Sequence, residues 1–207
     1  YFYNDVFFKK ILKKKRNNKQ LKLQYLKIKK LKKMIKFVYQ NSPRGTGDAV
    51  LKCKGLVKSK YFLMLLPDDL ITKINCSKSM LKLHRRYKSS VIASKKIKPN
   101  DVSRWGIFKL EKFNKNNFFI RDVIEKPSIK SAPSNYAVIG RYILPRKIFS
   151  ILKNQKAGRG GEIHITDAIR KLIQGKEKFI GHIFTGRYLD CGTMRGYIKS
   201  SLKMSKI

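Results

Sequence analysis

The stretch Tyr61-Phe62-Leu63-Met64-Leu65-Leu66-Pro67-Asp68-Asp69 joins a short apolar run to a pair of carboxylates. The run is far shorter than the roughly 18 apolar residues of a membrane span, and it predicts a fully buried strand that ends at Pro67. Open α/β sheets bind ligands beyond the carboxyl ends of their strands. Asp68 and Asp69 are therefore candidates to hold Mg²⁺, which in turn holds phosphates. An Asp-Asp pair can equally cap the next helix, and the residues alone leave both interpretations open.

On both sides of this stretch, short apolar runs alternate with helical patterns, which is typical of an α/β domain. No internal repeat or domain linker interrupts the alternation. The expected strands cover residues 37–40, 61–66, 90–94, 105–110, 118–124, 136–144 and 179–184. One expected helix begins near residue 46, and the others cover residues 77–87, 145–153, 166–173 and 193–202.

Residues 5–35 have a different pattern, with apolar residues at helical spacing and lysines over the remaining face. Asn17-Asn18 predicts a break between two helices. A basic face of this kind is either solvated or an arm that binds RNA or anionic lipid. No aromatic stacking pattern accompanies the lysines, which favours the solvated face.

The net charge is extreme, because 50 Lys+Arg against 12 Asp+Glu give +38 over 207 residues. Such a polycation attracts nucleic acid, an anionic membrane surface or phosphorylated small molecules. The basic residues are, however, 38 Lys and 12 Arg, whereas proteins that read nucleic acid favour Arg for bidentate base contacts. We interpret much of the charge as lysine accepted at exposed positions under an A- and T-rich genome. No specific nucleic acid and no membrane is expected as a partner.

Cysteine and histidine limit the compartment and the chemistry. Cys53, Cys76 and Cys191 are odd in number and form no C-x-x-C pair, which suits a reducing cytoplasm. The 3 histidines lack metal-ligand spacing, so no zinc site is expected. The chain begins with Tyr1 rather than Met, and we expect a fragment or a processed product.

Three further segments carry candidate ligand groups. The turn at Gly45 leads into a helix whose first N–H groups can approach a base or a phosphate, although an ordinary glycine turn has the same pattern. The Glu125 carboxylate can accept hydrogen bonds from vicinal sugar hydroxyls, while the Lys126 ammonium can neutralise a phosphate. A strand-end ion pair explains these two residues equally well. Asp190 follows the last expected strand as another isolated carboxylate.

Seven regions, taken together and in order, resemble the bacterial UTP–glucose-1-phosphate uridylyltransferases. They begin at residues 38, 65, 102, 123, 132, 160 and 187 and read VYQ followed by RGTGDAV, LLPDD, VSRWGI, VIEKP, APSNYAVIGRY, GGEIHITDAI and RYLDCG. The resemblance covers nearly the whole chain. It implies an α/β fold, Rossmann-like and with a mixed central sheet flanked by helices, as a single nucleotidyltransferase domain over residues 1–207.

The resemblance also implies a reaction, in which UMP passes from UTP to glucose 1-phosphate with Mg²⁺ as cofactor and gives UDP-glucose and pyrophosphate. The residues implied for catalysis are Asp68 and Asp190, which would hold the Mg²⁺, and Lys126, which would lie against the phosphates. The residues implied for substrate binding are Gln40 and Gly45 at the uracil, Gly106 and Glu125 at the glucose, and Asp69 on the sugar side. A cytoplasmic homo-oligomer with the C-terminal helix as a contact is implied as well.

One departure from the family matters most. Its members carry a strand and a glycine-rich loop, G-x-G-T-R, that wraps the UTP phosphates, and none of the 13 glycines here lies in such a motif. We therefore expect a fragment that lacks the family's N-terminal strands, is inactive or nearly so, and leaves a sheet edge or apolar surface exposed. Two alternatives stay open. One is a sister enzyme for another nucleotide or sugar phosphate, and the other is a basic RNA- or membrane-surface-binding module on a decayed scaffold.

Overall fold

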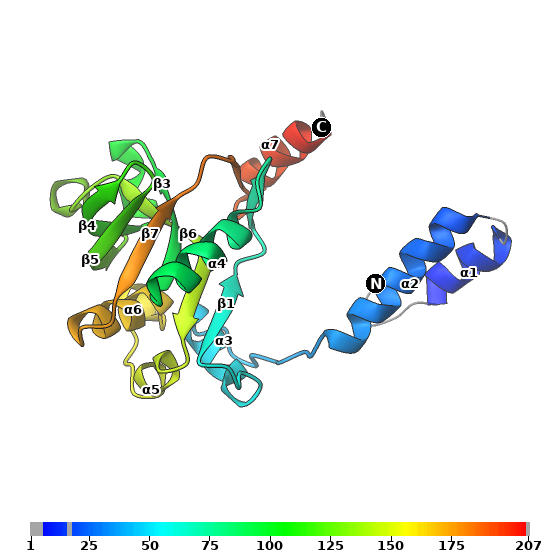
Figure 1. Ribbon diagram of the computed structural model, residues 1–207, viewed down its shortest axis with the longest axis horizontal. Coiled ribbons are helices and arrows are strands. Elements are labelled where there is room, and N and C mark those ends of the chain that lie inside the picture. Colours follow the sequence, from blue (N-terminus) through cyan, green and yellow to red (C-terminus); the bar gives the residue numbers. More distant parts are fainter. Residues whose placement is uncertain (1–5, 16–17, 206–207) are drawn as a thin grey trace. The chain divides into compact units, whose positions relative to one another are not determined.

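The computed structural model describes residues 6–15 and 18–205, and its contacts group the chain into two units, Tyr1–Tyr39 and Gln40–Ile207 (Figure 1). Within these described ranges, no helix is long and apolar enough to cross a membrane. The expectation of one nucleotidyltransferase domain over residues 1–207 stays a prediction.

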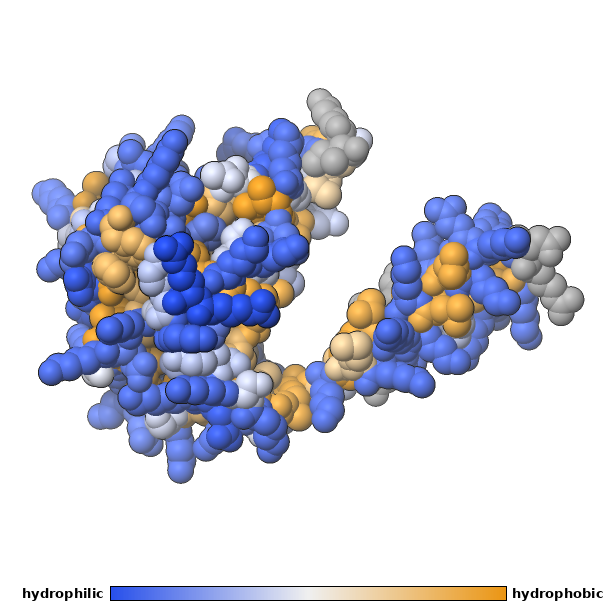
Figure 2. All heavy atoms as spheres, in the orientation of Figure 1, coloured by the Kyte–Doolittle hydropathy of each residue, from blue (hydrophilic) through white to orange (hydrophobic). Residues whose placement is uncertain are grey.

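The first unit consists of two helices, α1 (Val6–Lys14) and α2 (Lys19–Met34). Asn18 caps α2, because its side-chain oxygen accepts a hydrogen bond from the Leu21 N–H at 2.9 Å, as short polar side chains do at helix starts. The two predicted helices and the break at Asn18 are confirmed, while Asn17 lies outside the described residues. No residue of α2 is buried, and Figure 2 shows apolar side chains scattered among the lysines of this unit.

The prediction of a strand at residues 37–40 is wrong. The segment has no regular secondary structure, and the side chains of Phe37, Val38 and Tyr39 are exposed. A strand needs a neighbour for its backbone hydrogen bonds, and no described strand pairs with this segment. An apolar run in a sequence carries no information about whether that neighbour exists.

The second unit is built on a six-stranded sheet of order β1-β6-β3-β7-β5-β4. Strands β3 and β7 run parallel and the other neighbours run antiparallel, so the sheet is mixed, as expected. The strands are β1 (Tyr61–Leu65), β3 (Ser90–Lys96), β4 (Gly106–Asn114), β5 (Asn117–Glu125), β6 (Tyr136–Pro145) and β7 (Phe179–Ile183).

Strand β1 lies at one edge of this sheet. Its position agrees with the prediction, but the expectation of full burial is wrong, since Leu63 is 37% and Leu65 49% exposed. The reason is that β1 pairs with β6 alone among the described strands. A run of apolar residues predicts the strand, but it does not predict how many of its sides are covered.

Helices cover both faces of the sheet (Figure 1). Strand β3 shows this directly, because Ile92 packs in the core that includes Leu152 and Ile169, whereas Val91 packs in a second core with Met80. Successive side chains of a strand point to opposite faces, so β3 is buried from both sides. The helices are α3 (Thr46–Lys52), α4 (Cys76–Tyr87), α5 (Ile148–Lys153), α6 (Ile165–Gln174) and α7 (Met194–Met204), with short 3-10 turns at Cys53–Gly55, Pro99–Arg104, Ile129–Ser131 and Arg159–Gly161.

A second, smaller sheet pairs β2 (Asp69–Thr72) antiparallel with β8 (Arg187–Asp190). The sequence did not predict these two short strands. Their register sets Asp69 directly opposite Asp190. The pairing therefore brings the end of the stretch at residues 61–69 beside the segment at residues 187–192, although the two lie far apart in the sequence.

Candidate functional site

A cavity of about 290 Å³ lies beyond the carboxyl end of β1. It collects six of the eight residues to which the sequence assigns a role, namely Asp68, Asp69, Gly106, Glu125, Lys126 and Asp190. Gln40 and Gly45 are not among its lining residues. Larger cavities of about 580 Å³, one beside Tyr61 and one beside Thr72, contain none of the six.

The carboxylate side of this cavity is formed where β2 and β8 pair. The Cys191 N–H donates a hydrogen bond to the Asp68 carbonyl oxygen at 2.8 Å. A Cβ atom added to Gly192 would lie 2.9 Å from Oδ2 of Asp68 and 3.3 Å from Oδ1 of Asp190. The two carboxylates therefore approach one point in space, and a glycine at position 192 leaves room for them.

Asp68 and Asp190 fit a Mg²⁺ site by their chemistry. Proteins usually bind Mg²⁺ through one or two carboxylates, with water and substrate phosphates as the other ligands, and two converging carboxylates are what this wall offers. Within the described part of the chain, no group of three or more His, Cys, Asp or Glu could hold a metal ion. Water, or phosphate oxygens of a substrate, would thus complete the coordination.

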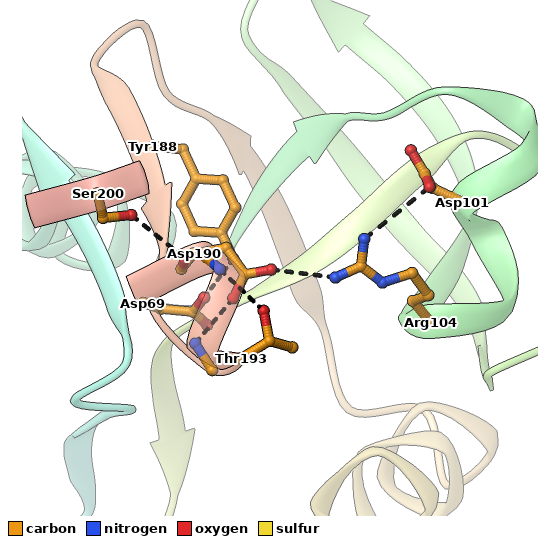
Figure 3. A network of polar contacts seen from close by, with 9 residues as sticks. Asp69, Asp101, Arg104, Tyr188, Asp190, Thr193 and Ser200 are labelled. Carbon is orange, nitrogen blue, oxygen red and sulfur yellow. Dashed lines mark hydrogen bonds and ion pairs between the residues drawn. The ribbon is translucent and has the colours of Figure 1, made fainter. Parts of the chain in front are cut away.

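Arg104 supplies positive charge at the same wall. Its guanidinium lies 3.2 Å from Oδ2 of Asp190 and 3.9 Å from Oδ1 of Asp101, as Figure 3 shows. The Arg104 side chain is 52% exposed, so water screens the ion pair and weakens it. A cation in the cavity would compete with Arg104 for Asp190, whereas a phosphate could pair with the Arg104 guanidinium.

Asp69 is buried at this wall, with 6% of its surface exposed. The Tyr188 hydroxyl donates a hydrogen bond to its Oδ1, and the Gly140 N–H donates one to its Oδ2 at 2.7 Å. Burial raises the pKa of Asp69 against the opposing effect of these two hydrogen bonds. Burial and the neighbouring Asp69 charge raise the pKa of Tyr188, so its hydroxyl remains a donor at neutral pH.

The opposite wall is formed at the ends of β4 and β5. Gly106 and Glu125 are cross-strand partners, and a Cβ atom added to Gly106 would lie 3.2 Å from Oε2 of Glu125. Lys126 has a left-handed backbone with φ 45°, and its N–H donates to the Trp105 carbonyl oxygen at 2.9 Å. The Arg159 guanidinium donates to the Lys126 carbonyl oxygen. Backbone contacts thus fix the point at which the Glu125 and Lys126 side chains leave the sheet.

Gln40 and Gly45 lie together at the start of α3. Gln40 Nε2 donates to Oδ2 of Asp48 at 2.7 Å and to the Gly45 carbonyl oxygen at 3.3 Å. The hydrogen bond from Gln40, together with the charge of Arg44, lowers the pKa of Asp48 although burial acts in the opposite direction. This segment also reaches the cavity, because Thr46 lines it, and the Gly47 N–H donates to the Ile163 carbonyl oxygen at 2.7 Å.

Several side chains of the site, Arg104 among them, were not assigned a role from the sequence. Thr46, Tyr142 and His164 line the cavity, and Nε2 of His164 lies 2.7 Å from the Arg159 carbonyl oxygen. Burial raises the pKa of Tyr142. Tyr188 gave no signal in the sequence either, because the strand that sets it on the same face as Asp190 was not predicted.

A family model for nucleotidyl transferases matches residues 3–207. A UTP–glucose-1-phosphate uridylyltransferase of Pseudomonas aeruginosa is 34% identical over 180 residues, which are 84% of this chain and 64% of that protein. A protein of the same name from Streptococcus pyogenes is 36% identical over 174 residues, which are 81% of this chain and 57% of that protein.

Solved structures of UDP-glucose pyrophosphorylases are similar to this chain in fold. A UDP-glucose pyrophosphorylase complexed with UDP-glucose has a TM-score of 0.78 at 36% identity and covers 83% of this chain and 66% of its own. A UTP-bound UGPase from Acinetobacter baumannii has a TM-score of 0.76 at 28% identity, over 99% of this chain and 71% of its own. The expected nucleotidyltransferase fold is thereby confirmed. The chain spans 57% and 64% of the two curated relatives.

Proposed function

Because the chain belongs to the nucleotidyl transferase family, we propose that it carries the sugar-phosphate and cation site of a UTP–glucose-1-phosphate uridylyltransferase. A phosphate oxygen of glucose 1-phosphate attacks the α-phosphorus of UTP. The new P–O bond forms as the bond from that phosphorus to the bridging oxygen breaks, which releases pyrophosphate and leaves UDP-glucose. The observation that carries the proposal is a single cavity that joins Asp68 and Asp190 to Gly106, Glu125 and Lys126.

Transfer of this kind asks a protein mainly for positioning and for neutralisation of charge. Asp68 and Asp190 would hold the Mg²⁺, whose chemistry when bound is to neutralise phosphate oxygens. Lys126 adds an ammonium on the opposite wall. Arg104, which is paired with Asp190 at 3.2 Å, adds a second cation that can turn from the carboxylate to a phosphate.

The sugar lies on the β4–β5 side in this proposal. The Glu125 carboxylate accepts hydrogen bonds from two vicinal hydroxyls of the glucose. Gly106 has no side chain, so the ring can approach the backbone beside Glu125. Gln40 and Gly45 contact the uracil, since their turn lies against the segment at residues 162–165, and Glu162, His164 and Ile165 line the cavity.

Ligand binding tests the proposal directly. Titration calorimetry with UDP-glucose and Mg²⁺ should show binding to the chain, and Asp68→Asn, Asp190→Asn and Glu125→Gln should each weaken it about tenfold or more. Glu111→Gln is the matched control, because Glu111 is exposed and pairs with Arg121. Absence of UDP-glucose binding would refute the proposed function. Tighter binding of dTDP-glucose or GDP-mannose would instead identify a sister enzyme.

Turnover is a separate question. No G-x-G-T-R loop occurs in the 207 residues, so we propose that the chain forms UDP-glucose from UTP and glucose 1-phosphate very slowly or not at all. A coupled assay for released pyrophosphate measures this. A rate well above the background without protein would contradict this part of the proposal and leave the binding site unaffected.

We further propose a cytoplasmic homo-oligomer with α7 at the contact. One face of α7 is apolar and exposed, with the three- and four-residue spacing of a helix, and it carries Met194, Tyr197, Ile198 and Leu202. The cytoplasmic location is supported by the three cysteines, which are free thiols. Light scattering after size exclusion should show a multimer, which Leu202→Ser converts to a monomer. Leu81→Ser on α4, also exposed, is the control that should leave the multimer intact.

A further inference from the structure

Three elements of the second unit meet at one carboxylate. Asp69 begins β2, the hydroxyl donor of Tyr188 comes from β8, and the N–H donor of Gly140 comes from β6. Figure 3 shows Asp69 and Tyr188 beside Asp190. The carboxylate therefore joins the small β2–β8 sheet to the central sheet at the point where the cavity begins.

Gly140 packs closely against Asp69 and Leu66 at this point. A Cβ atom at Gly140 would collide with Oδ2 of Asp69 and would lie 2.6 Å from Cβ of Leu66. A buried carboxylate is stable only when hydrogen bonds replace the water it has lost. Both oxygens of Asp69 have such a donor from the protein itself. Asp69 is thus built into the wall rather than directed at a ligand.

The neighbours of Asp69 are the two carboxylates that converge. Asp68 precedes it in the chain, and Asp190 faces it across the β2–β8 pair. Tyr188 lies two residues before Asp190 on the same strand. A hydrogen bond from Tyr188 to Asp69 therefore fixes the position of β8 beside β2, and with it the distance between the Asp68 and Asp190 side chains.

We infer that Asp69 is a positioning residue that acts through Tyr188 and Gly140 to hold Asp68 and Asp190 at the separation a divalent cation requires. The inference rests on the proposed function for the identity of the cation site. It assigns Asp69 a different role from the sugar-side one that the family resemblance implies. Groups that orient metal ligands from behind change metal affinity by about 10- to 100-fold when they are replaced.

Mn²⁺ binding to the whole chain, followed by electron paramagnetic resonance without sugar or nucleotide, tests this inference. Tyr188→Phe, which removes one hydroxyl, and Asp69→Asn should each weaken Mn²⁺ binding about tenfold. Tyr61→Phe is the matched control, because Tyr61 is also a half-buried tyrosine but lies at the other end of β1. A role in stability alone would lower the unfolding midpoint and leave Mn²⁺ affinity unchanged, which would overturn the inference.

A second measurement is independent of any metal. Hydrogen exchange of the backbone at residues 187–192 should accelerate in Tyr188→Phe and stay unchanged in Tyr61→Phe. Unchanged exchange would overturn the inference even if Mn²⁺ bound poorly. Loss of UDP-glucose binding in Tyr188→Phe with full Mn²⁺ affinity would also overturn it, in favour of a sugar-side Asp69. Failure of the wild-type chain to bind UDP-glucose would instead count against the proposed function.

Discussion

The two walls of the cavity are built by two strand pairs that differ in what holds them. In β2–β8 the opposed residues are Asp69 and Asp190, and in β4–β5 they are Gly106 and Glu125. The first pair has four residues in each strand and is joined to the central sheet through buried hydrogen bonds. The second has nine residues in each strand and belongs to the central sheet itself.

The difference teaches that the two walls can fail separately. The β4–β5 wall depends on apolar packing, since Phe108 of β4 and Phe118 of β5 are fully buried. The β2–β8 wall depends on a few polar contacts. Loss of the apolar core at β4–β5 should unfold the unit, whereas loss of a single polar contact at β2–β8 should leave the fold and weaken the binding of a cation.

The largest effect is expected for Phe118→Ala. The ring lies edge-on to Phe108 with centroids 5.5 Å apart, and its removal leaves a cavity in the core, so the free energy of unfolding should fall by about 3–5 kcal/mol. Urea denaturation measures it. Phe119→Ala, on the opposite and more exposed face of β5, should cost clearly less. Equal losses for the two variants would contradict the dependence of the β4–β5 wall on apolar packing.

Two glycines sharpen the comparison. In Gly140→Ala the new methyl collides with Asp69 and Leu66, and the free energy of unfolding should fall by about 1–3 kcal/mol. In Gly106→Ala the nearest atoms are 3.1–3.2 Å away, so stability should change little while UDP-glucose affinity falls. Paired urea and calorimetric titrations measure both. A destabilised Gly106→Ala that still binds UDP-glucose would refute the contrast.

Arg104→Gln should change Mn²⁺ affinity, by less than Tyr188→Phe does and in the opposite direction. It removes a guanidinium 3.2 Å from Oδ2 of Asp190, so a divalent cation no longer competes with it, and Mn²⁺ should bind about twofold to fivefold more tightly, as fits an exposed ion pair worth about 0.2–1 kcal/mol. Arg121→Gln, whose partner Glu111 is exposed, is the control. Weaker Mn²⁺ binding in Arg104→Gln would show that the arginine assists the site instead.

The smallest effect is expected from acid at Asp48, in the first turn of α3. The pKa of Asp48 is lower in the folded chain than its ordinary value of 3.8, first through the hydrogen bond from Gln40. The ionised carboxylate therefore stabilises the fold above that value, and the contribution disappears as the pH falls through the lowered pKa. Urea midpoints of the wild type and Asp48→Asn should differ more at pH 6 than at pH 3. A difference independent of pH would contradict this.

The sequence predicted the helices and strands well where packing covers both sides of a strand or where a cap residue marks the start of a helix. Strands near residues 90, 118 and 136 and the helices at residues 77 and 166 form because their apolar pattern matches their packing. It failed at residues 37–40 and in the burial of β1, because both depend on whether a neighbouring strand is present. No local pattern records that neighbour.

The candidate site was predicted as separate pieces, and its assembly was not. Asp68, Glu125 and Asp190 were each visible as acids at strand ends, and the cavity does bring them together. The β2–β8 pair that accomplishes this is four residues long in each strand, too short for alternation to stand out. The role of Tyr188 follows only from its contact with Asp69, 119 residues away in the sequence, which no local pattern reveals.

Charge is distributed unevenly in this molecule, and the unevenness has a kinetic consequence. Five of the 12 acidic residues line one small cavity, in a chain whose net charge is +38. Far from the cavity a phosphorylated ligand is attracted by the whole molecule, over a screening length of about 10 Å at 0.1 M salt. Added salt should therefore slow its capture steeply, while its release, which is governed inside the acidic cavity, should change far less.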